Sequence, residues 1–113
     1  KLPNRILLSD RLLHDMAQTR RNNQHLAVIF LDLDGFKEVN DTYGHVIGDK
    51  LLIALSNEMK KELREGDTLS RIGGDEFVAV LIGLDEVIIG LPIISRLVKS
   101  ASKKVDRYKL LLV

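Results

Sequence analysis

Apolar residues recur at helical spacing near the start of the chain. This spacing predicts an amphipathic helix whose core-facing residues are Ile6, Leu8, Leu12, Leu13, Met16 and Ala17. Asn4 stands directly before the helix and can accept one of its free backbone amides as an N-cap. The polar residues 20–24 predict the connection that ends it.

A continuous apolar run follows and changes the expected element from helix to strand. Its length, far below that of a membrane span, predicts a strand Leu26–Leu33 that is buried on both faces. Asp32 and Asp34 emerge at its end. Acids at the end of a buried strand are typical of metal sites, because the strand fixes the carboxylate while its end opens to solvent. Asp34 could instead cap the next helix, whereas Asp32 comes too early to do so.

Helical spacing returns twice in the middle of the chain. We expect a short helical turn at Phe36–Asn40 and a longer helix at Ile47–Glu65, with Gly66 as the C-terminal stop of the longer helix. The predicted inward residues of the longer helix are Leu52, Leu55, Met59 and Leu63.

Two short apolar segments then predict a β-hairpin with strands Thr68–Ile72 and Phe77–Ile82. Its tip reads Gly73-Gly74-Asp75-Glu76. Glycine permits positive φ and carries no Cβ, while carboxylates are the hard oxygen ligands that magnesium prefers. The tip is therefore expected to bring backbone close to a phosphate and a metal; the alternative is an ordinary polar turn.

The C-terminal part predicts a helix at Pro92–Lys104 and a strand at Lys109–Val113. Inward residues of that helix would be Ile94, Leu97, Val98 and Ala101. Strands and helices in this order predict an α+β fold, in which helices pack on an antiparallel sheet. No linker divides residues 1–113, so one domain with one core is expected.

Composition excludes several classes of function. Seventeen basic and sixteen acidic residues are mixed along the chain, so there is no sign of a nucleic-acid-binding arm. The absence of cysteine excludes disulfides, thiolate metal sites and thiol redox chemistry. No apolar stretch approaches the roughly 18 residues of a membrane span, so this segment is expected to make no membrane contact. A cytoplasmic location is expected, with any membrane anchor lying in another segment of the parent protein.

Three spaced segments form a pattern that is far more specific than any one of them. They read Leu2-Pro3-Asn4-Arg5, Asp32-x-Asp34-x-Phe36-Lys37-x-Val39-Asn40-Asp41-x-x-Gly44-His45-x-x-Gly48-Asp49, and Arg71-x-Gly73-Gly74-Asp75-Glu76-Phe77. On these residues the chain closely resembles the GGDEF family of diguanylate cyclases, from its first residues to at least Ile82. The resemblance implies a ferredoxin-like, nucleotidyl-cyclase-type plait, with Asp32 beside the hairpin tip on neighbouring central strands.

The resemblance also implies an activity, which is the condensation of two GTP molecules into cyclic di-GMP with loss of two pyrophosphates. Each 3′-hydroxyl would attack the α-phosphate of the other nucleotide with the help of Mg²⁺ or Mn²⁺. One site holds only one of the two reacting nucleotides, so a transient homodimer is required. Such an enzyme would serve bacterial second-messenger signalling.

Metal-binding and catalytic roles are carried over by motif position. Asp32, the backbone carbonyl of Leu33 and Asp75 would hold the metal. Glu76 would either complete the metal site or assist deprotonation of the hydroxyl, and the sequence does not separate these two roles. Asp75 and Glu76 are thus the candidate catalytic residues.

Substrate-binding roles follow in the same way. The β- and γ-phosphates would be bound by Gly35, Phe36 and Lys37, while Gly74 would let the α-phosphate approach the hairpin. Asn40 and Asp49 match the guanine-reading residues. An amide and a carboxylate can pair with guanine N3, N1 and N2, whereas adenine would leave the carboxylate unpaired, so GTP is expected over ATP.

A product-binding site is implied at Arg64-Glu65-Gly66-Asp67, which resembles the family's inhibitory RxxD site. Its Arg would bind phosphate and guanine of cyclic di-GMP, its Asp a guanine edge, and Arg96 is a candidate secondary arginine. We assign His45 and Asp41 to turn structure rather than catalysis.

The chain also departs from the family pattern. Family members continue into further strands and a last helix whose Lys and Arg residues reach the terminal phosphates, so this chain is expected to be a C-terminally truncated domain that binds GTP weakly and turns it over slowly or not at all. One alternative is a non-catalytic domain that senses GTP or cyclic di-GMP, which calorimetry would reveal. Another is a relative of polymerase palms or adenylyl cyclases, which would bind ATP as well as GTP.

Overall fold

A four-stranded antiparallel sheet with strand order β2-β3-β1-β4 forms the centre of the molecule. The computed structural model describes residues 4–33, 36–86, 92–96 and 105–112, the last of these as backbone only. The strands are β1 (His25–Leu33), β2 (Thr68–Arg71), β3 (Glu76–Leu84) and β4 (Val105–Leu112).

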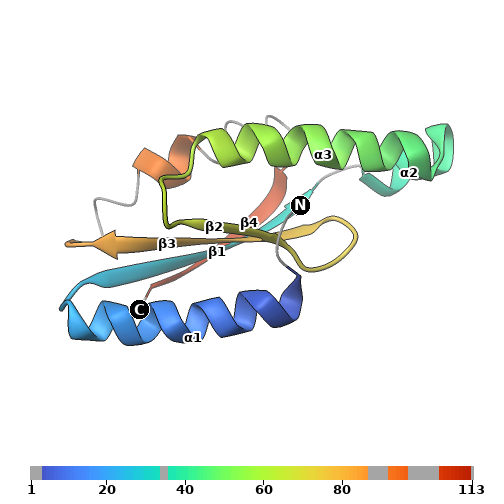
Figure 1. Cartoon of the computed structure of the whole chain (residues 1–113). Coiled ribbons are helices and arrows are strands. Elements are labelled where there is room, and N and C mark those ends of the chain that lie inside the picture. The colour runs from blue at the N-terminus through green and yellow to red at the C-terminus, as the bar shows by residue number, and fades with distance from the viewer. Residues whose placement is uncertain (1–3, 34–35, 87–91, 97–104, 113) are drawn as a thin grey trace.

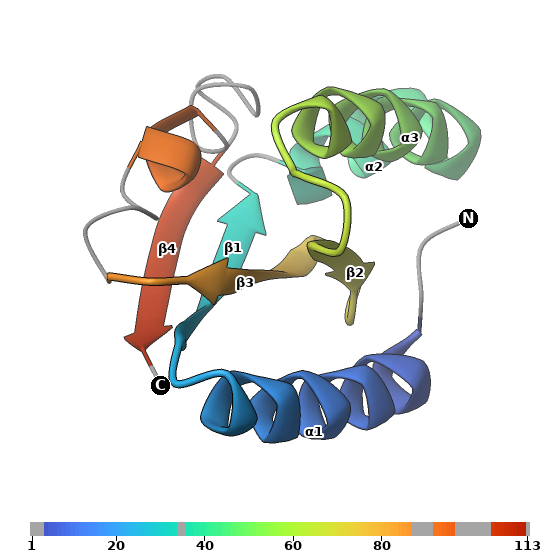
Figure 2. The ribbon, with the colours of Figure 1, turned by 60° about the vertical axis from the view of Figure 1, so that its left-hand side comes forward.

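Helices cover both faces of this sheet (Figure 1). Helix α1 (Arg5–Arg21) lies on one face, while α2 (Phe36–Tyr43) and α3 (His45–Lys61) lie on the other. The view in Figure 2 shows the strands between these two layers, with α1 below and α3 above. The predicted α+β fold is therefore confirmed.

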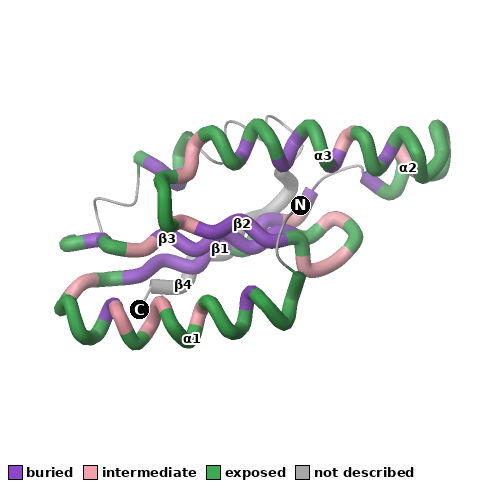
Figure 3. The backbone as a smooth tube through the Cα atoms, in the orientation of Figure 1, coloured by how far each residue is buried: buried purple, intermediate pink, exposed green. Residues whose placement is uncertain are grey.

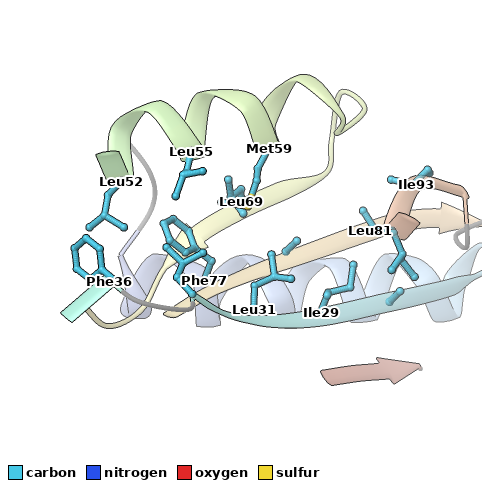
Figure 4. Packing of buried hydrophobic residues seen from close by; sticks show 14 of the residues in the cluster. Ile29, Leu31, Phe36, Leu52, Leu55, Met59, Leu69, Phe77, Leu81 and Ile93 are labelled. Carbon is cyan, nitrogen blue, oxygen red and sulfur yellow. The ribbon is translucent and has the colours of Figure 1, made fainter. Parts of the chain in front are cut away.

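Burial on both faces explains the continuous apolar run of β1, whose interior is among the most buried parts of the chain (Figure 3). Alternate residues point to opposite faces of a strand, so Ile29 and Leu31 join the core under α3 while Leu26 and Val28 join the core under α1. Figure 4 shows the first core, where side chains of the sheet meet side chains of α2 and α3. Its labelled members are Ile29, Leu31, Phe36, Leu52, Leu55, Met59, Leu69, Phe77, Leu81 and Ile93.

Helix α1 begins as predicted, because Asn4 Oδ1 accepts from the Leu7 amide at 2.9 Å. Its predicted inward face is only partly right. Leu8 is buried and Leu12 and Met16 pack against the core, but the side chains of Ile6, Leu13 and Ala17 are exposed. At 100° per residue these three lie more than a quarter turn from the line of inward residues, so a single sheet face does not reach them.

The two middle helices have different limits from those predicted. Helix α2 extends to Tyr43, and α3 begins at His45 and ends at Lys61, four residues before the predicted end. Gly66 has a φ of 92° and lies in the following turn instead of stopping the helix. The inward residues were predicted correctly, since Leu52, Leu55 and Met59 are buried and Leu63 packs against the same core.

The C-terminal predictions are confirmed in part. Residues 92–96 are helical and Ile94 is buried, whereas the predicted inward residues Leu97, Val98 and Ala101 lie outside the described residues. Strand β4 begins at Val105, four residues before the predicted start. Among the described helices, none has the length and apolar character needed to cross a membrane.

Candidate functional site

The pairing of β1 with β3 brings the predicted carboxylates to one end of the sheet. Asp32 stands directly opposite Glu76, and the Leu33 amide donates to the Asp75 carbonyl at 3.0 Å. Residues directly opposite in an antiparallel pair point to the same face, with Cβ atoms roughly 5 Å apart. The structure therefore places Asp32 beside the hairpin tip on the neighbouring central strand.

The other neighbour of β1 is irregular at the same place. The register of β1 with β4 shifts between Asp32, opposite Arg107, and Leu33, opposite Val105. Irregularities of this kind bend a strand and locally disrupt the ladder, and they are common beside active sites. Asp32 is therefore held by regular pairing to β3 on one side and lies at a break in pairing on the other.

The donors at this end of the sheet suit a hard divalent cation. Asp32, Asp75 and Glu76 supply carboxylate oxygens, although within the described residues no three His, Cys, Asp or Glu side chains form a ready metal cage. Magnesium is commonly held by one or two carboxylates together with substrate phosphates. The donor chemistry therefore fits Mg²⁺ whose coordination is completed by a nucleotide. Asp34 lies outside the described residues.

Two arginines hold the hairpin tip, and the sequence analysis assigned them no role. Arg71 Nε donates to the carbonyls of both Gly73 and Gly74 at 3.1 Å, and Arg5 Nη2 donates to the Ile72 carbonyl at 3.2 Å. The Ile72 amide closes the hairpin by donating to the Glu76 carbonyl at 3.0 Å. Both arginines belong to the spaced pattern, which was the available signal, but only the fold shows that they reach one loop.

The tip glycines were expected to permit positive φ and to leave space by lacking a Cβ. Neither Gly73 nor Gly74 has a positive φ, so the tip does not use the first of these properties. A Cβ at Gly74 would meet no heavy atom within 4 Å, and a Cβ at Gly73 would meet only the Glu76 side chain at ordinary contact distance. Within the described residues, neither backbone geometry nor packing requires glycine at position 74. The open space there suits the predicted approach of a phosphate.

The predicted phosphate-binding residues lie at the start of α2. Phe36 is its first residue and its side chain is buried in the core, so only its backbone is placed to face a ligand. Lys37 is exposed beside it, and Gly35 lies outside the described residues. A helix N-terminus presents unpaired amides that favour phosphate.

The predicted guanine-reading residues lie on the two helices α2 and α3, which pack against each other. Asn40 is in α2, and its Oδ1 is buried with no hydrogen-bond partner in the described part of the chain. Asp49 is exposed in the second turn of α3. Gly44, with a φ of 88°, joins the helices, and its amide donates to the Asn40 carbonyl at 2.8 Å.

The predicted product-site residues are engaged with each other. The Asp67 carboxylate is fully buried and accepts from the Arg64 amide at 3.0 Å, from Arg64 Nε at 3.3 Å and from the Ile82 amide at 3.1 Å. Arg64 Nη2 also donates to the Ile82 carbonyl at 2.6 Å. In this conformation no ligand can reach the Asp67 carboxylate, while Arg64 stays partly exposed. Arg96 pairs with Glu62 at 3.3 Å instead of lying free.

One carboxyl outside the site has a shifted pKa. Partial burial of Asp15 on α1 raises the pKa of its carboxyl, and the negative charge of Asp67 adds to this, while His14 and Arg11 oppose it.

Comparison with known proteins gives consistent matches. Residues 1–111 match the family model described as diguanylate cyclase, GGDEF domain. The chain is 48% identical over 103 residues, 91% of its length, to the bifunctional diguanylate cyclase/cyclic di-GMP phosphodiesterase MucR of Pseudomonas aeruginosa. It is 45% identical over 80 residues, 71% of its length, to diguanylate cyclase DgcP of the same organism. It spans only 15% and 12% of the lengths of these two relatives.

A solved structure agrees with these matches. The crystal structure of the GGDEF domain of YfiN, also called TpbB, from P. aeruginosa has a TM-score of 0.83 and is 32% identical. The match covers 99% of this chain and 74% of that one.

Proposed function

Because the chain belongs to the GGDEF family, we propose that it is a diguanylate cyclase domain that condenses two GTP molecules into cyclic di-GMP. The observation that carries this proposal is the register that sets Asp32 opposite Glu76 with Asp75 beside Leu33. The relatives named as diguanylate cyclases support it. The cell compartment proposed is the cytoplasm, where such a domain would serve bacterial signalling.

The residues at the end of β1 and at the hairpin tip would bind the metal and assist proton transfer. Asp32, Asp75 and the Leu33 carbonyl would hold Mg²⁺, or Mn²⁺ in its place. When bound, the metal would supply positive charge that acidifies a hydroxyl and stabilises negative charge on phosphate oxygens. Glu76 either adds a ligand or accepts the proton from the attacking 3′-hydroxyl.

The remaining residues bind and orient the nucleotide. Gly74 leaves space for the α-phosphate, and the start of α2 with Lys37 would bind the β- and γ-phosphates. Asn40 and Asp49 would read guanine. Each such site holds one GTP, so two copies must face each other, and bond formation releases one pyrophosphate from each nucleotide.

The test is to incubate the purified chain with GTP and Mg²⁺ and to measure cyclic di-GMP. Asp32→Asn and Glu76→Gln keep the side-chain shape but remove charge, so each is expected to lower synthesis by about 100-fold or more, as loss of a charged catalytic group commonly does. Asp10→Asn, on the exposed surface of α1, is the matched control and should leave synthesis unchanged.

Two results would overturn the proposal. One is failure to bind GTP in the presence of Mg²⁺, and the other is synthesis that persists unchanged in Asp32→Asn. Weak GTP binding with little turnover is also expected of this chain as a cyclase domain, so the discriminating result is binding of cyclic di-GMP, measured by calorimetry, with no Mg²⁺-dependent turnover even at high protein and GTP concentrations. That result would instead favour a non-catalytic sensing domain.

A further inference from the structure

Gly48 lies in the first turn of α3 and is buried. Its φ is not among the positive values, and it lies inside a helix, where alanine is preferred to glycine. Backbone geometry therefore gives no reason for glycine at this position. The reason must lie in what occupies the space next to its Cα.

That space is filled by the side chain of Asn40. A Cβ built on Gly48 would overlap Asn40 Oδ1 and lie 2.9 Å from Asn40 Cγ, which is closer than real Cβ contacts. The next nearest atom is Phe36 Cε1, at an ordinary 3.5 Å. Only the Asn40 carboxamide therefore depends on the missing side chain.

The Asn40 carboxamide is fixed by shape and not by polar bonds. Its Oδ1 is buried without a hydrogen-bond partner among the described residues, and a buried unpaired acceptor is unfavourable. Native proteins keep few such groups, and each needs an explanation. The two polar atoms of an amide diverge from Cγ, so seating one of them against Gly48 directs the other away from Gly48.

We propose that Gly48 is a positioning residue, whose missing side chain forms a seat that holds the Asn40 carboxamide in the orientation that reads guanine. This inference rests on the proposed function, because it presumes that Asn40 contacts the base. It goes beyond that function by assigning nucleotide selectivity to a residue that carries no functional group.

The predicted effect of Gly48→Ala follows from which atoms can move. Asn40 Oδ1 is the end of a short rotatable side chain, so the new methyl group would push the carboxamide out of its seat while the helix remains intact. Guanine recognition should suffer, and the carboxylates at the end of β1 should be unaffected. The Michaelis constant for GTP should therefore rise while kcat at saturating GTP stays nearly constant.

The experiment is a double-mutant cycle of the unmodified chain, Gly48→Ala, Asn40→Ala and the double variant. GTP and ATP affinities are measured by calorimetry with Mg²⁺, and thermal unfolding is measured without nucleotide. Gly48→Ala is expected to weaken GTP binding by about tenfold and to narrow the preference for GTP over ATP, as expected when one base contact is lost. In the Asn40→Ala background the same change should have no further effect on binding. Asn57→Ala, at an exposed position of α3, controls for altered helix propensity.

Unfolding provides a readout that does not depend on nucleotide. Gly48→Ala should raise the melting temperature less when Asn40 is present, because the carboxamide must move, than in the Asn40→Ala background, where alanine improves the helix without a clash. Absence of this difference between the two backgrounds would overturn the seat itself. Gly48→Ala with unchanged GTP affinity, or an equal loss of affinity in both backgrounds, would overturn the positioning role. If the unmodified chain binds no GTP, the proposed function fails and the positioning role fails with it, whereas the unfolding cycle still decides whether the seat exists.

Discussion

Gly74 is a residue whose proposed role depends on its lack of a Cβ. A Cβ there meets no protein atom within 4 Å and its φ is not positive, so the fold itself tolerates alanine. A methyl group in the proposed path of the α-phosphate would nevertheless displace the substrate, and small displacements are costly for catalysis. A substitution at position 74 should therefore affect activity without affecting folding.

We predict that Gly74→Ala changes the melting temperature by about 2 °C or less but lowers cyclic di-GMP synthesis by about 100-fold. The control is Gly83→Ala, because Gly83 has a φ of 66°, at which alanine is strained. That variant should lose stability, and its synthesis below the melting temperature should be unchanged. A Gly74→Ala variant with full activity would exclude a close approach of phosphate to the tip.

Asp15 provides a prediction about pH. Because burial raises the pKa of its carboxyl in the folded state, the folded chain binds this proton more tightly than the unfolded chain, so its contribution to stability falls as pH rises above about 4. Asp15→Asn removes the cost of ionising this partly buried carboxyl. Its melting temperature should exceed that of the unmodified chain by about 2 °C at pH 7, and the gain should vanish near pH 3. A gain that persists at pH 3 would assign the effect to packing.

Residues fixed by local pattern could be predicted, while those fixed by long-range contact could not. Asp32, Asp75 and Glu76 stand at strand ends that apolar patterning defines, and antiparallel pairing then sets Asp32 opposite Glu76. Arg5 donates a hydrogen bond to the carbonyl of Ile72, 67 positions away, and the local sequence does not predict that hydrogen bond. The burial of Asp67 likewise depends on β3 and was missed.

At the scale of elements, the turn between α3 and β2 shows why a helix limit was misjudged. Apolar spacing extends to Leu63, but the Glu62 and Leu63 amides already donate three residues back, and the Arg64 amide then donates to the Asp67 carboxylate instead of continuing the helix. The same carboxylate joins the turn to β3 through the Ile82 amide. A tertiary contact therefore overrides a helical pattern whose inward face was otherwise predicted correctly.

The bonds from the Arg64 and Ile82 amides to the Asp67 carboxylate predict that Asp67→Ala lowers the free energy of unfolding by about 2–3 kcal/mol. In that variant the two backbone amides lose their buried acceptor. Arg64→Ala should cost about 1 kcal/mol or less, because the Arg64 side chain is partly exposed. Urea unfolding without nucleotide measures both. Equal and small effects would show that the pair has no structural role and is open to a ligand such as cyclic di-GMP.

At the scale of the whole molecule, the α+β arrangement was predictable from the order of strands and helices along the chain. The pairing of β4 beside β1 was not specified, because register between distant strands depends on contacts outside both segments. The described residues carry one set of the proposed site residues. Under the proposed cyclase function, condensing two nucleotides would therefore need a second copy.

We predict that synthesis per chain falls as the protein is diluted, because the facing pair of sites dissociates. Adding an excess of Asp32→Asn chain to a fixed amount of unmodified chain should suppress the activity, since mixed pairs contain only one competent site. An equal excess of Asp10→Asn should not suppress it. Activity per chain that stays constant on dilution, together with no suppression, would argue for a monomeric enzyme.

The central position of β1, covered by a core on each side, has a consequence for how the protein inactivates. Backbone amides of such a strand should exchange with deuterium only through global opening, whereas the surface turn at Arg64 can open locally. Asp32 lies on this strand, whose amides we expect to exchange most slowly. Heat should therefore abolish catalysis only when the whole domain melts, and the two transitions should coincide.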